Sequence, residues 1–355
     1  MPEQLTIASH KGEYLVRFAA ERDWVRAWLE GEPHCLIDAL VARLHEETLR
    51  PLLAHPRTIL IEATESNKSI ERIVEVMRRL IEQKLRRDHA LIAIGGGIVQ
   101  DITCFAASTL LRGVPWKFAP TTLLAQADSC IGSKSSVNLG TAKNMLGTFY
   151  PPREVVVDGG FLATLAERDL RSGIGEIIKV HAIESAAAFD RLAQNYERLR
   201  AEPPLLRHYI ERALAIKQRF IEADEFDTGI RNVFNYGHSF GHAIESATDF
   251  AVPHGIAVTM GMEIANHVAA QRGLLPWAQH ARMRTLLERN YRGFERTAIP
   301  FEGVRAALLK DKKNTSAQLV LILPTGEEAT VRRTPVDNDA AFHDQLAAAL
   351  GQLHS

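Results

Sequence analysis

The stretch RNVFNYGHSFGHAIESATDFAVPHG, residues 231–255, is the part of the chain around which the rest is organised. His238 and His242 are spaced i, i+4, so on a helix their side chains project from one face. His254 follows a loop that contains Pro253. Two imidazoles and one carboxylate make a typical open catalytic zinc site. The histidine pair alone also fits a helix cap and a core histidine, so the metal interpretation depends on the rest of the chain.

The composition is that of an ordinary globular chain. Its 355 residues favour about two domains, with 46% hydrophobic and 24% charged residues. A formal net charge of -1 gives no electrostatic reason to expect nucleic acid or a membrane surface as a partner. The three cysteines lack CxxC spacing, which excludes a thiolate metal motif and fits a reducing compartment. Without a secretory leader or an apolar run of about 18 residues, we expect a soluble, cytoplasmic protein.

Short apolar runs alternate with helical patterns through the first half of the chain. We expect an amphipathic helix over residues 70–83. The expected strands cover residues 35–38, 58–62, 89–94 and 116–119. Asp38 would place a carboxylate at the carboxyl edge of the first strand. Strands separated by helices indicate a mainly parallel sheet with ligands at its carboxyl ends, so the pattern predicts a nucleotide-binding α/β domain.

A glycine turn, Gly95-Gly96-Gly97, lies between the strand at 89–94 and a helix at 98–111. Backbone N–H groups in such a turn can approach a pyrophosphate closely, and the positive end of the helix favours the anion. The turn lacks the GxGxxG spacing, so a plain tight turn is the alternative.

Residues 128–150 concentrate polar and cationic side chains among glycines and serines. These side chains are Asp128, Lys134, Asn138, Lys143 and Asn144. Small residues let a backbone approach a ligand, and lysines act as point charges for phosphate or carboxylate. A solvated surface loop is the alternative interpretation.

A helical pattern from residue 168 onward places Glu176 and Lys179 three apart on one face, among apolar neighbours. A buried carboxylate needs a partner, because an unpaired buried charge is costly. The two residues therefore form a salt bridge, or they act as a metal ligand and a substrate-binding cation.

Eight motifs follow one another along the chain: GGGIVQD, FAASTLLRG, PTTLLAQADSCIGSKSSVN, KNMLGTFYPP, SGIGEIIK, GIRNVFNYGHSFGHAIE, HGIAVTMGM and LKDKKN. Over about residues 35–325 the chain resembles 3-dehydroquinate synthase and its sugar-phosphate cyclase relatives. The resemblance implies a Rossmann-like, NAD-binding α/β domain over residues 1–165. It also implies a mainly helical metal- and substrate-binding domain over residues 166–355, and a homodimer.

The same resemblance implies the site residues. The metal, zinc or else cobalt or another divalent ion, would be held by Glu176, His238 and His254. The NAD site would comprise Asp38, Glu65, Lys68, Gly95, Gly96, Gly97, Asp101, Thr121, Thr122, Phe161 and Thr164. Catalytic roles would fall to Lys134, Lys179, His242, Asp128 and Asn144. Substrate-binding roles would fall to Arg112, Lys143, Lys217, Arg231, Asn235 and Lys313.

The reaction that the resemblance implies is a phosphate-releasing cyclisation with transient reduction of NAD. Arg231 and Asn235 favour a carboxylated substrate, because a guanidinium binds a carboxylate through two parallel hydrogen bonds. That substrate would be 3-deoxy-D-arabino-heptulosonate 7-phosphate, which 3-dehydroquinate synthase converts to 3-dehydroquinate and phosphate in the shikimate pathway of aromatic amino acid biosynthesis.

The sequence departs from the usual family motifs in three ways. Ile256 replaces a glutamate, the segment GSKSSVN adds bulk at Ser133 and Ser136, and Gln100 replaces a glycine. These departures leave open a specialised cyclase that acts on sedoheptulose 7-phosphate or another sugar phosphate. A third hypothesis is a metal-dependent alcohol dehydrogenase of the glycerol dehydrogenase type. The lysines and arginine of the implied phosphate pocket argue against that hypothesis.

Overall fold

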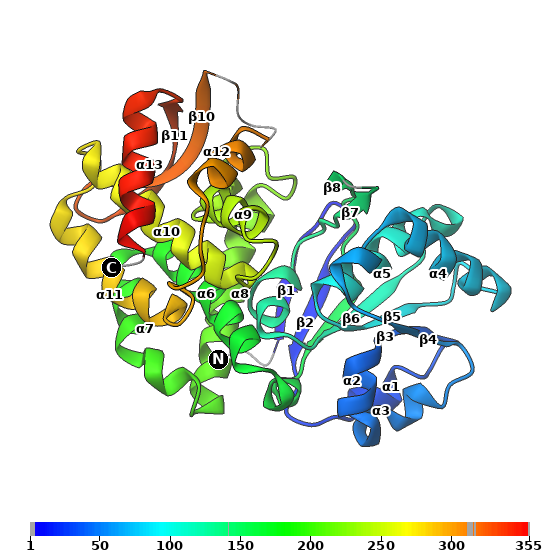
Figure 1. The fold of residues 1–355 in the computed structure, drawn as a ribbon. Coiled ribbons are helices and arrows are strands. Elements are labelled where there is room, and N and C mark those ends of the chain that lie inside the picture. The colour runs from blue at the N-terminus through cyan, green and yellow to red at the C-terminus, as the bar shows by residue number, and fades with distance from the viewer. Residues whose placement is uncertain (1–3, 141, 311–314, 316, 354–355) are drawn as a thin grey trace. The chain divides into compact units, whose positions relative to one another are not determined.

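The computed structural model describes residues 4–140, 142–310, 315 and 317–353 (Figure 1). The chain divides into two compact units. Unit 1 comprises Met1–Ala166 and Lys217–Phe226, and unit 2 comprises Glu167–Ile216 and Asp227–Ser355. Lys313, one of the predicted substrate ligands, lies outside the described residues. Within the described ranges every helix is too short or too polar to cross a lipid bilayer.

A seven-stranded sheet with the order β1-β2-β9-β6-β5-β3-β4 forms the centre of unit 1 (Figure 1). The strands are β1 (Gln4–Ile7), β2 (Tyr14–Phe18), β3 (His34–Asp38), β4 (Thr58–Ile61), β5 (Leu91–Gly95), β6 (Trp116–Pro120) and β9 (Glu154–Val157). Strand β1 is antiparallel to β2, and all the other neighbouring pairs are parallel. The prediction of a mainly parallel sheet in an α/β fold is therefore confirmed.

Helices connect the parallel strands of unit 1, because parallel neighbours need a crossover connection. They are α1 (Trp24–Ala27), α2 (Ala39–Leu44), α3 (Glu46–Leu53), α4 (Ile70–Glu82) and α5 (Gly97–Thr109). Shorter turns are η1 (Glu65–Asn67), η2 (Leu110–Arg112), η4 (Gly159–Thr164) and η3 (Ala125–Ser129), the last of which is a π-helix. Every residue of β5 is buried, which explains why its sequence is a continuous apolar run.

The polar segment 128–150 is not a simple surface loop. It contains a hairpin of β7 (Val137–Leu139) and β8 (Ala142–Leu146), whose register shifts between Val137 and Leu139. The sequence did not predict this hairpin, because its strands are short and β8 is largely exposed. Neither strand has the hydrophobic alternation that marks a half-buried strand.

Unit 2 is mainly helical. Its elements are α6 (Glu167–Glu184), α7 (Ala186–Leu199), α8 (Pro203–Ala223), η5 (Ile230–Asn235), α9 (His238–Ala247), α10 (His254–Gln271), α11 (Trp277–Tyr291), α12 (Phe301–Leu309), β10 (Gln318–Thr325), β11 (Thr330–Asp337) and α13 (Ala340–Gln352). The last seven residues of α8 group with unit 1. Helix α10 is buried over nearly its whole length and packs against α6, α9, α11 and α13.

Glycines let the backbones of α6, α9 and α10 approach closely. A Cβ on Gly255 would overlap the carbonyl oxygen of Ser172, and a Cβ on Gly175 would overlap the carbonyl of Gly255. A Cβ on Gly261 would likewise overlap the carbonyl of Gly237. These contacts place α10 against α6 at one point and against α9 at another, so the close packing of the three helices depends on missing side chains.

The glycine contact between α9 and α10 predicts the effect of Gly261→Ala. The new methyl group would force the two helices apart, so we expect a loss of about 1–3 kcal/mol in the free energy of unfolding. Gly351→Ala in α13 is the matched control, because its Cβ would meet nothing within 4 Å. That control should be neutral or stabilising by up to about 1 kcal/mol. Urea titration of both variants checks this, and equal midpoints would contradict it.

Candidate functional site

Three histidines of unit 2 gather at the starts of two helices. Gly237 adopts a left-handed backbone, with φ of 76°, and α9 begins at the next residue, His238. His254 is the first residue of α10. The ring centroids of His238 lie 5.3 Å from those of both His242 and His254, and His242 stacks on His254 at 5.5 Å. One nitrogen from each ring lies within 4.8 Å of the others, so the predicted i, i+4 pair and His254 form one cluster.

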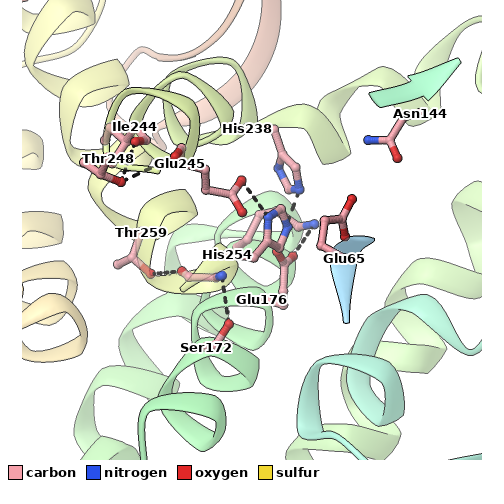
Figure 2. Close-up of polar contacts among 12 residues, drawn as sticks. Glu65, Asn144, Ser172, Glu176, His238, Ile244, Glu245, Thr248, His254 and Thr259 are labelled. Atoms are coloured by element: carbon pink, nitrogen blue, oxygen red, sulfur yellow. Dashed lines mark hydrogen bonds and ion pairs between the residues drawn. The ribbon is translucent and has the colours of Figure 1, made fainter. Parts of the chain in front are cut away.

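Glu176 faces this cluster from α6. Its side chain is 1% exposed, and its Oε2 lies 2.5 Å from the ammonium of Lys179, which is 2% exposed. Its Oε1 lies 3.2 Å from Nε2 of His254 and 3.7 Å from Nε2 of His238 (Figure 2). Glu176 and Lys179 therefore form a salt bridge, and the second carboxylate oxygen faces the imidazoles.

The charges of the cluster suit a cation. Burial raises the pKa of Glu176, but Lys179, His238 and His254 together hold it well below its usual range, so the carboxylate is ionised. Burial, reinforced by Lys179, lowers the pKa of His238, so this ring is neutral. Burial lowers the pKa of His254, but hydrogen bonds to Glu176 and Glu245 outweigh it and raise the value to about 10. In the metal-free chain, a proton on His254 supplies the positive charge between two carboxylates.

Both candidate histidine ligands have a second partner that fixes the ring. Nδ1 of His254 lies 3.1 Å from Oε2 of Glu245, and Nδ1 of His238 lies 3.3 Å from the carbonyl oxygen of Tyr236. Figure 2 shows Glu245 and Glu176 at opposite nitrogens of the His254 ring. A metal-bound histidine commonly donates its other N–H to such a carboxylate or carbonyl. In both rings Nε2 is thus the nitrogen available to a metal.

Glu245 is a residue of the candidate site that the sequence interpretation missed. It lies in the same stretch, 231–255, as the histidines, three residues after His242. The one feature of the sequence that could have indicated Glu245 is that it lies on the same helix as His238 and His242. Its partner, His254, belongs to the next helix, so spacing along one helix does not reveal the pair.

The donor set fits a divalent ion such as zinc. Metal bonds of about 2.0–2.2 Å in a tetrahedral arrangement place ligand atoms about 3.3–3.6 Å apart. The separations from Glu176 Oε1 to the two Nε2 atoms, 3.2 and 3.7 Å, bracket that spacing. Both oxygens of Glu176 are buried, Oε2 beside the Lys179 ammonium and Oε1 beside the two imidazoles, so Oε1 is the oxygen placed to bind a cation. The ring of His242 lies beside these groups, with its centroid 5.3 Å from that of His238 and 5.5 Å from that of His254.

In unit 1, the candidate dinucleotide residues lie at the carboxyl edge of the sheet. Asp38 ends β3 and Gly95 ends β5, and these strands are neighbours at the point where the strand order reverses. A Cβ on Gly95 would lie 2.6 Å from the side chain of Val99, and a Cβ on Gly96 would lie 2.9 Å from that of Thr122. A Cβ on Gly97 would meet nothing within 4 Å, so open space lies at the first turn of α5. The glycine turn and the start of α5 therefore leave room for a pyrophosphate.

Lys68 joins several predicted cofactor residues. Its ammonium donates to Oδ1 of Asn144 at 3.0 Å and lies 3.5 Å from Asp101 and 3.7 Å from Glu65. Burial raises the pKa of Asp101 to about 6, although Lys68 and Ser136 oppose the shift. The predicted catalytic residue Asn144 is therefore in the same network as three predicted cofactor residues.

The other predicted cofactor residues occupy different surroundings. Phe161 is 1% exposed and packs in the hydrophobic core with Trp24, so its ring is closed to a ligand. Thr164 is exposed and bonds to Nε2 of His45 at 2.8 Å. The N–H of Thr121 donates to the carbonyl of Gly95 at 2.9 Å, which keeps the threonine beside the glycine turn.

The predicted substrate residues are distributed over both units. In unit 1, Lys217 donates to the carbonyl oxygen of Asp128 at 2.6 Å and lies 2.6 Å from its carboxylate. The remaining unit 1 positions are exposed: Arg112, Lys134 and Lys143. In unit 2, Arg231 is buried in η5, where Asn235 donates to the carbonyl of Asn232 at 3.1 Å.

Family models match most of the chain. Residues 58–172 match the 3-dehydroquinate synthase N-terminal model, and residues 173–314 match the 3-dehydroquinate synthase C-terminal model.

Solved structures of cyclases match 96% of this chain. A 2-epi-5-epi-valiolone synthase from Streptomyces hygroscopicus, with NAD+ and Zn2+ bound, is 30% identical over 96% of both chains, with a TM-score of 0.82. A 2-deoxy-scyllo-inosose synthase complexed with carbaglucose-6-phosphate, NAD+ and Co2+ is 23% identical over 96% of this chain and 98% of that chain, with a TM-score of 0.81. A probable glycerol dehydrogenase from Sinorhizobium meliloti shares the fold at 17% identity, covering 95% and 96% of the chains, with a TM-score of 0.59.

The bond between Glu245 and His254 predicts that Glu245→Ala weakens zinc binding by about 10- to 100-fold, because the His254 ring loses its orienting carboxylate. Competition with a chromophoric chelator measures the affinity. Glu302→Ala, at an exposed glutamate of α12, is the matched control and should bind zinc as the unmodified chain does. His238→Ala should abolish binding, and zinc retained by that variant would contradict the ligand assignment.

The proton on His254 predicts a pH dependence of metal binding. The pKa of about 10 in the folded chain lies above the ordinary histidine value of 6.5, so the proton stabilises the metal-free fold at low pH. That contribution is full below pH 6.5 and is lost as the pH rises through 10. Because zinc must displace this proton, its affinity should rise about tenfold per pH unit in this window. Calorimetry in buffers of different ionisation enthalpy should show release of one proton, and release of none would contradict the assignment.

Proposed function

Because the chain belongs to the 3-dehydroquinate synthase family of sugar-phosphate cyclases, we propose that it converts 3-deoxy-D-arabino-heptulosonate 7-phosphate to 3-dehydroquinate and phosphate. The observation that carries the proposal is the cluster of Glu176, His238 and His254, in which one buried carboxylate oxygen lies 3.2 and 3.7 Å from two imidazole nitrogens. The proposal includes NAD and a divalent ion, as in the two cyclases described above, and service in the shikimate pathway.

When bound, NAD would supply a hydride acceptor that is restored within each turnover, and a divalent ion would supply a Lewis acid for a substrate hydroxyl. Glu176, His238 and His254 would hold the ion, and the glycine turn with Asp38 and Asp101 would hold the dinucleotide.

The side chains of this chain would bind and orient a highly anionic substrate. Lysines and arginines neutralise its phosphate and carboxylate and stabilise the negative charge that develops next to a ketone. The proposed cations are Lys134, Lys143, Lys179, Lys217, Arg231, Lys313 and, from a second copy of the chain, Arg112. His242, on the exposed face of α9 beside the metal cluster, is placed to move a proton during phosphate elimination. Asn144 and Asp128 would orient the substrate through hydrogen bonds.

Arg231 supports the choice of a carboxylated substrate. Its side chain lies in η5, directly before the turn that leads into α9 and His238. A guanidinium binds a carboxylate by two parallel hydrogen bonds, which a substrate without a carboxylate would not need.

A second candidate function is a specialised cyclase that acts on sedoheptulose 7-phosphate. The 30% identity to a 2-epi-5-epi-valiolone synthase over 96% of both chains favours it. The two candidates differ in the carboxylate of the substrate, so an experiment on Arg231 separates them. The glycerol dehydrogenase likeness, at 17% identity, extends to the fold alone.

The decisive assay measures phosphate release from a panel of sugar phosphates, with the product identified by mass spectrometry. We expect phosphate from the heptulosonate phosphate, dependent on NAD and zinc, without accumulation of NADH. Arg231→Met should raise KM for this substrate by about 10- to 100-fold, because charge-assisted hydrogen bonds to the carboxylate are lost. The same variant should retain zinc.

Arg305→Met, at a partly exposed arginine of α12 that pairs with Glu302, is the control for this substitution and should leave KM unchanged. Turnover of sedoheptulose 7-phosphate in place of the carboxylated sugar would favour the second candidate. Stoichiometric accumulation of NADH would contradict both cyclase functions.

A further inference from the structure

Asn138 connects three segments of unit 1. Its backbone N–H donates to the carbonyl of Lys68 at 2.9 Å, and its side-chain Nδ2 donates to Oε1 of Glu65 at 2.9 Å. Its Oδ1 accepts the backbone N–H of Asn144, also at 2.9 Å. The residue is 6% exposed and pairs with Ser69 through an isolated parallel bridge. The amide side chain thus joins the turn η1 to strand β8, and the backbone of Asn138 pairs with the segment that leads into α4.

Asn144 depends on this connection. Its backbone is left-handed, with φ of 54°, a conformation that costs a non-glycine residue energy and persists where surrounding bonds hold it. Asn138 holds the backbone N–H, and Lys68 holds the side-chain oxygen at 3.0 Å. These two bonds fix the backbone N–H and the Oδ1 of Asn144. Its side-chain NH2 takes no part in either bond.

The same network contains the proposed dinucleotide residues. Lys68 also lies 3.5 Å from Asp101, and Asp101 accepts hydrogen bonds from the N–H and hydroxyl of Ser136, at 3.0 and 3.3 Å. Ser136 lies directly before β7, so the hairpin that carries Asn144 is attached to Asp101 at one point and to Glu65 and Lys68 at another. Movement of the dinucleotide residues would therefore displace the hairpin.

We propose that Asn138 is a positioning residue that couples binding of the dinucleotide to the orientation of Asn144. The inference rests on the proposed function, in which Asn144 orients the sugar phosphate, and on the NAD site that the family resemblance implies, which includes Glu65 and Lys68. Asn138 itself touches neither ligand in this scheme. When NAD orders the turn that contains Glu65 and Lys68, the amide of Asn138 would in turn order Asn144. It does so through two hydrogen bonds, one to Glu65 at the Nδ2 end and one to Asn144 at the Oδ1 end.

The two ends of the amide can be separated by substitution. Asn138→Asp keeps an oxygen that accepts the N–H of Asn144, but it loses the donor to Glu65 and sets two carboxylates against each other. Asn138→Ala loses both bonds. A residue that only filled space or stabilised the hairpin would give parallel changes in all properties of the two variants, whereas a positioning residue gives different ones.

The experiment measures NAD+ affinity by calorimetry on the zinc-loaded protein, and kcat and KM for the heptulosonate phosphate at saturating NAD+. We expect both variants to bind NAD+ about tenfold more weakly, since each loses the bond to Glu65. We expect kcat to fall about tenfold or more in Asn138→Ala and by a clearly smaller factor in Asn138→Asp, which retains the bond to Asn144. Asn195→Ala, which removes side-chain bonds within α7 and to Tyr209, is the control for lost stability.

The outcomes are distinct. Unchanged NAD+ affinity in both variants, or an equal fall of kcat in the two, overturns the positioning role. Thermal unfolding shows whether each variant folds. If Asn138→Ala does not fold, the NAD+ affinity of Asn138→Asp alone tests the positioning role. If the unmodified protein binds NAD+ but releases no phosphate from any sugar phosphate, the proposed function fails, while the NAD+ titrations still test the link from Asn138 to Glu65.

Discussion

A carboxylate in the interior of unit 2 sets the arrangement on which the proposed metal centre depends. Glu176 is 1% exposed, and burying an uncompensated charge is too costly for a folded chain to sustain. Lys179 compensates one oxygen from the same helix, which leaves the other oxygen to the histidines. The lysine also adds to the effect of burial in keeping His238 neutral. One ammonium therefore maintains a charged carboxylate and an uncharged imidazole, the forms in which each can bind a metal.

The convergence of these groups requires backbones that come closer than side chains normally permit. Glu176 is on α6, His238 on α9 and His254 on α10, and α10 meets the other two helices at glycines. At the contact with α6, the hydroxyl of Ser172 also accepts the N–H of Gly255 at 2.9 Å, which fixes the first turn of α10 beside its histidine (Figure 2). The close packing of the helices thus sets the geometry of the candidate ligands, since a wider spacing between α6, α9 and α10 would separate the carboxylate from the imidazoles.

The sequence predicted features that lie within one element and missed those that join two. The helical period placed His238 beside His242 and Glu176 beside Lys179, and the apolar run before three glycines predicted β5, its turn and α5. Nothing in local spacing links Glu176 to His254, which are far apart in the chain, so that part of the ligand set came from the resemblance to a family. Glu245 was missed for the same reason: its bond to His254 crosses from α9 to α10. The hairpin β7–β8 was missed because side-chain bonds to Glu65 and Asp101, rather than an apolar face, hold it in place.

The departures from the usual family motifs affect where neighbouring segments lie, and they add no charged group to the candidate site. Ile256 is fully buried in α10 and presents no group to a ligand. Gln100 donates to the carbonyl of Ser129 and accepts its hydroxyl, at 2.6 and 2.7 Å, and so ties the π-helix of Asp128 to α5. Ser136 binds Asp101 on the same helix.

Two segments with proposed substrate ligands, Asp128 in one and Asn144 in the other, are thus anchored to α5, whose first turn faces the open space at Gly97. Gln100 and Ser136 set where those ligands stand relative to the glycine turn, and neither adds a charge. A change of substrate class would require a change of charge or of hydrogen-bonding groups at the ligands themselves. The substrate assignment therefore depends on Arg231 and Asn235, which these departures leave in place.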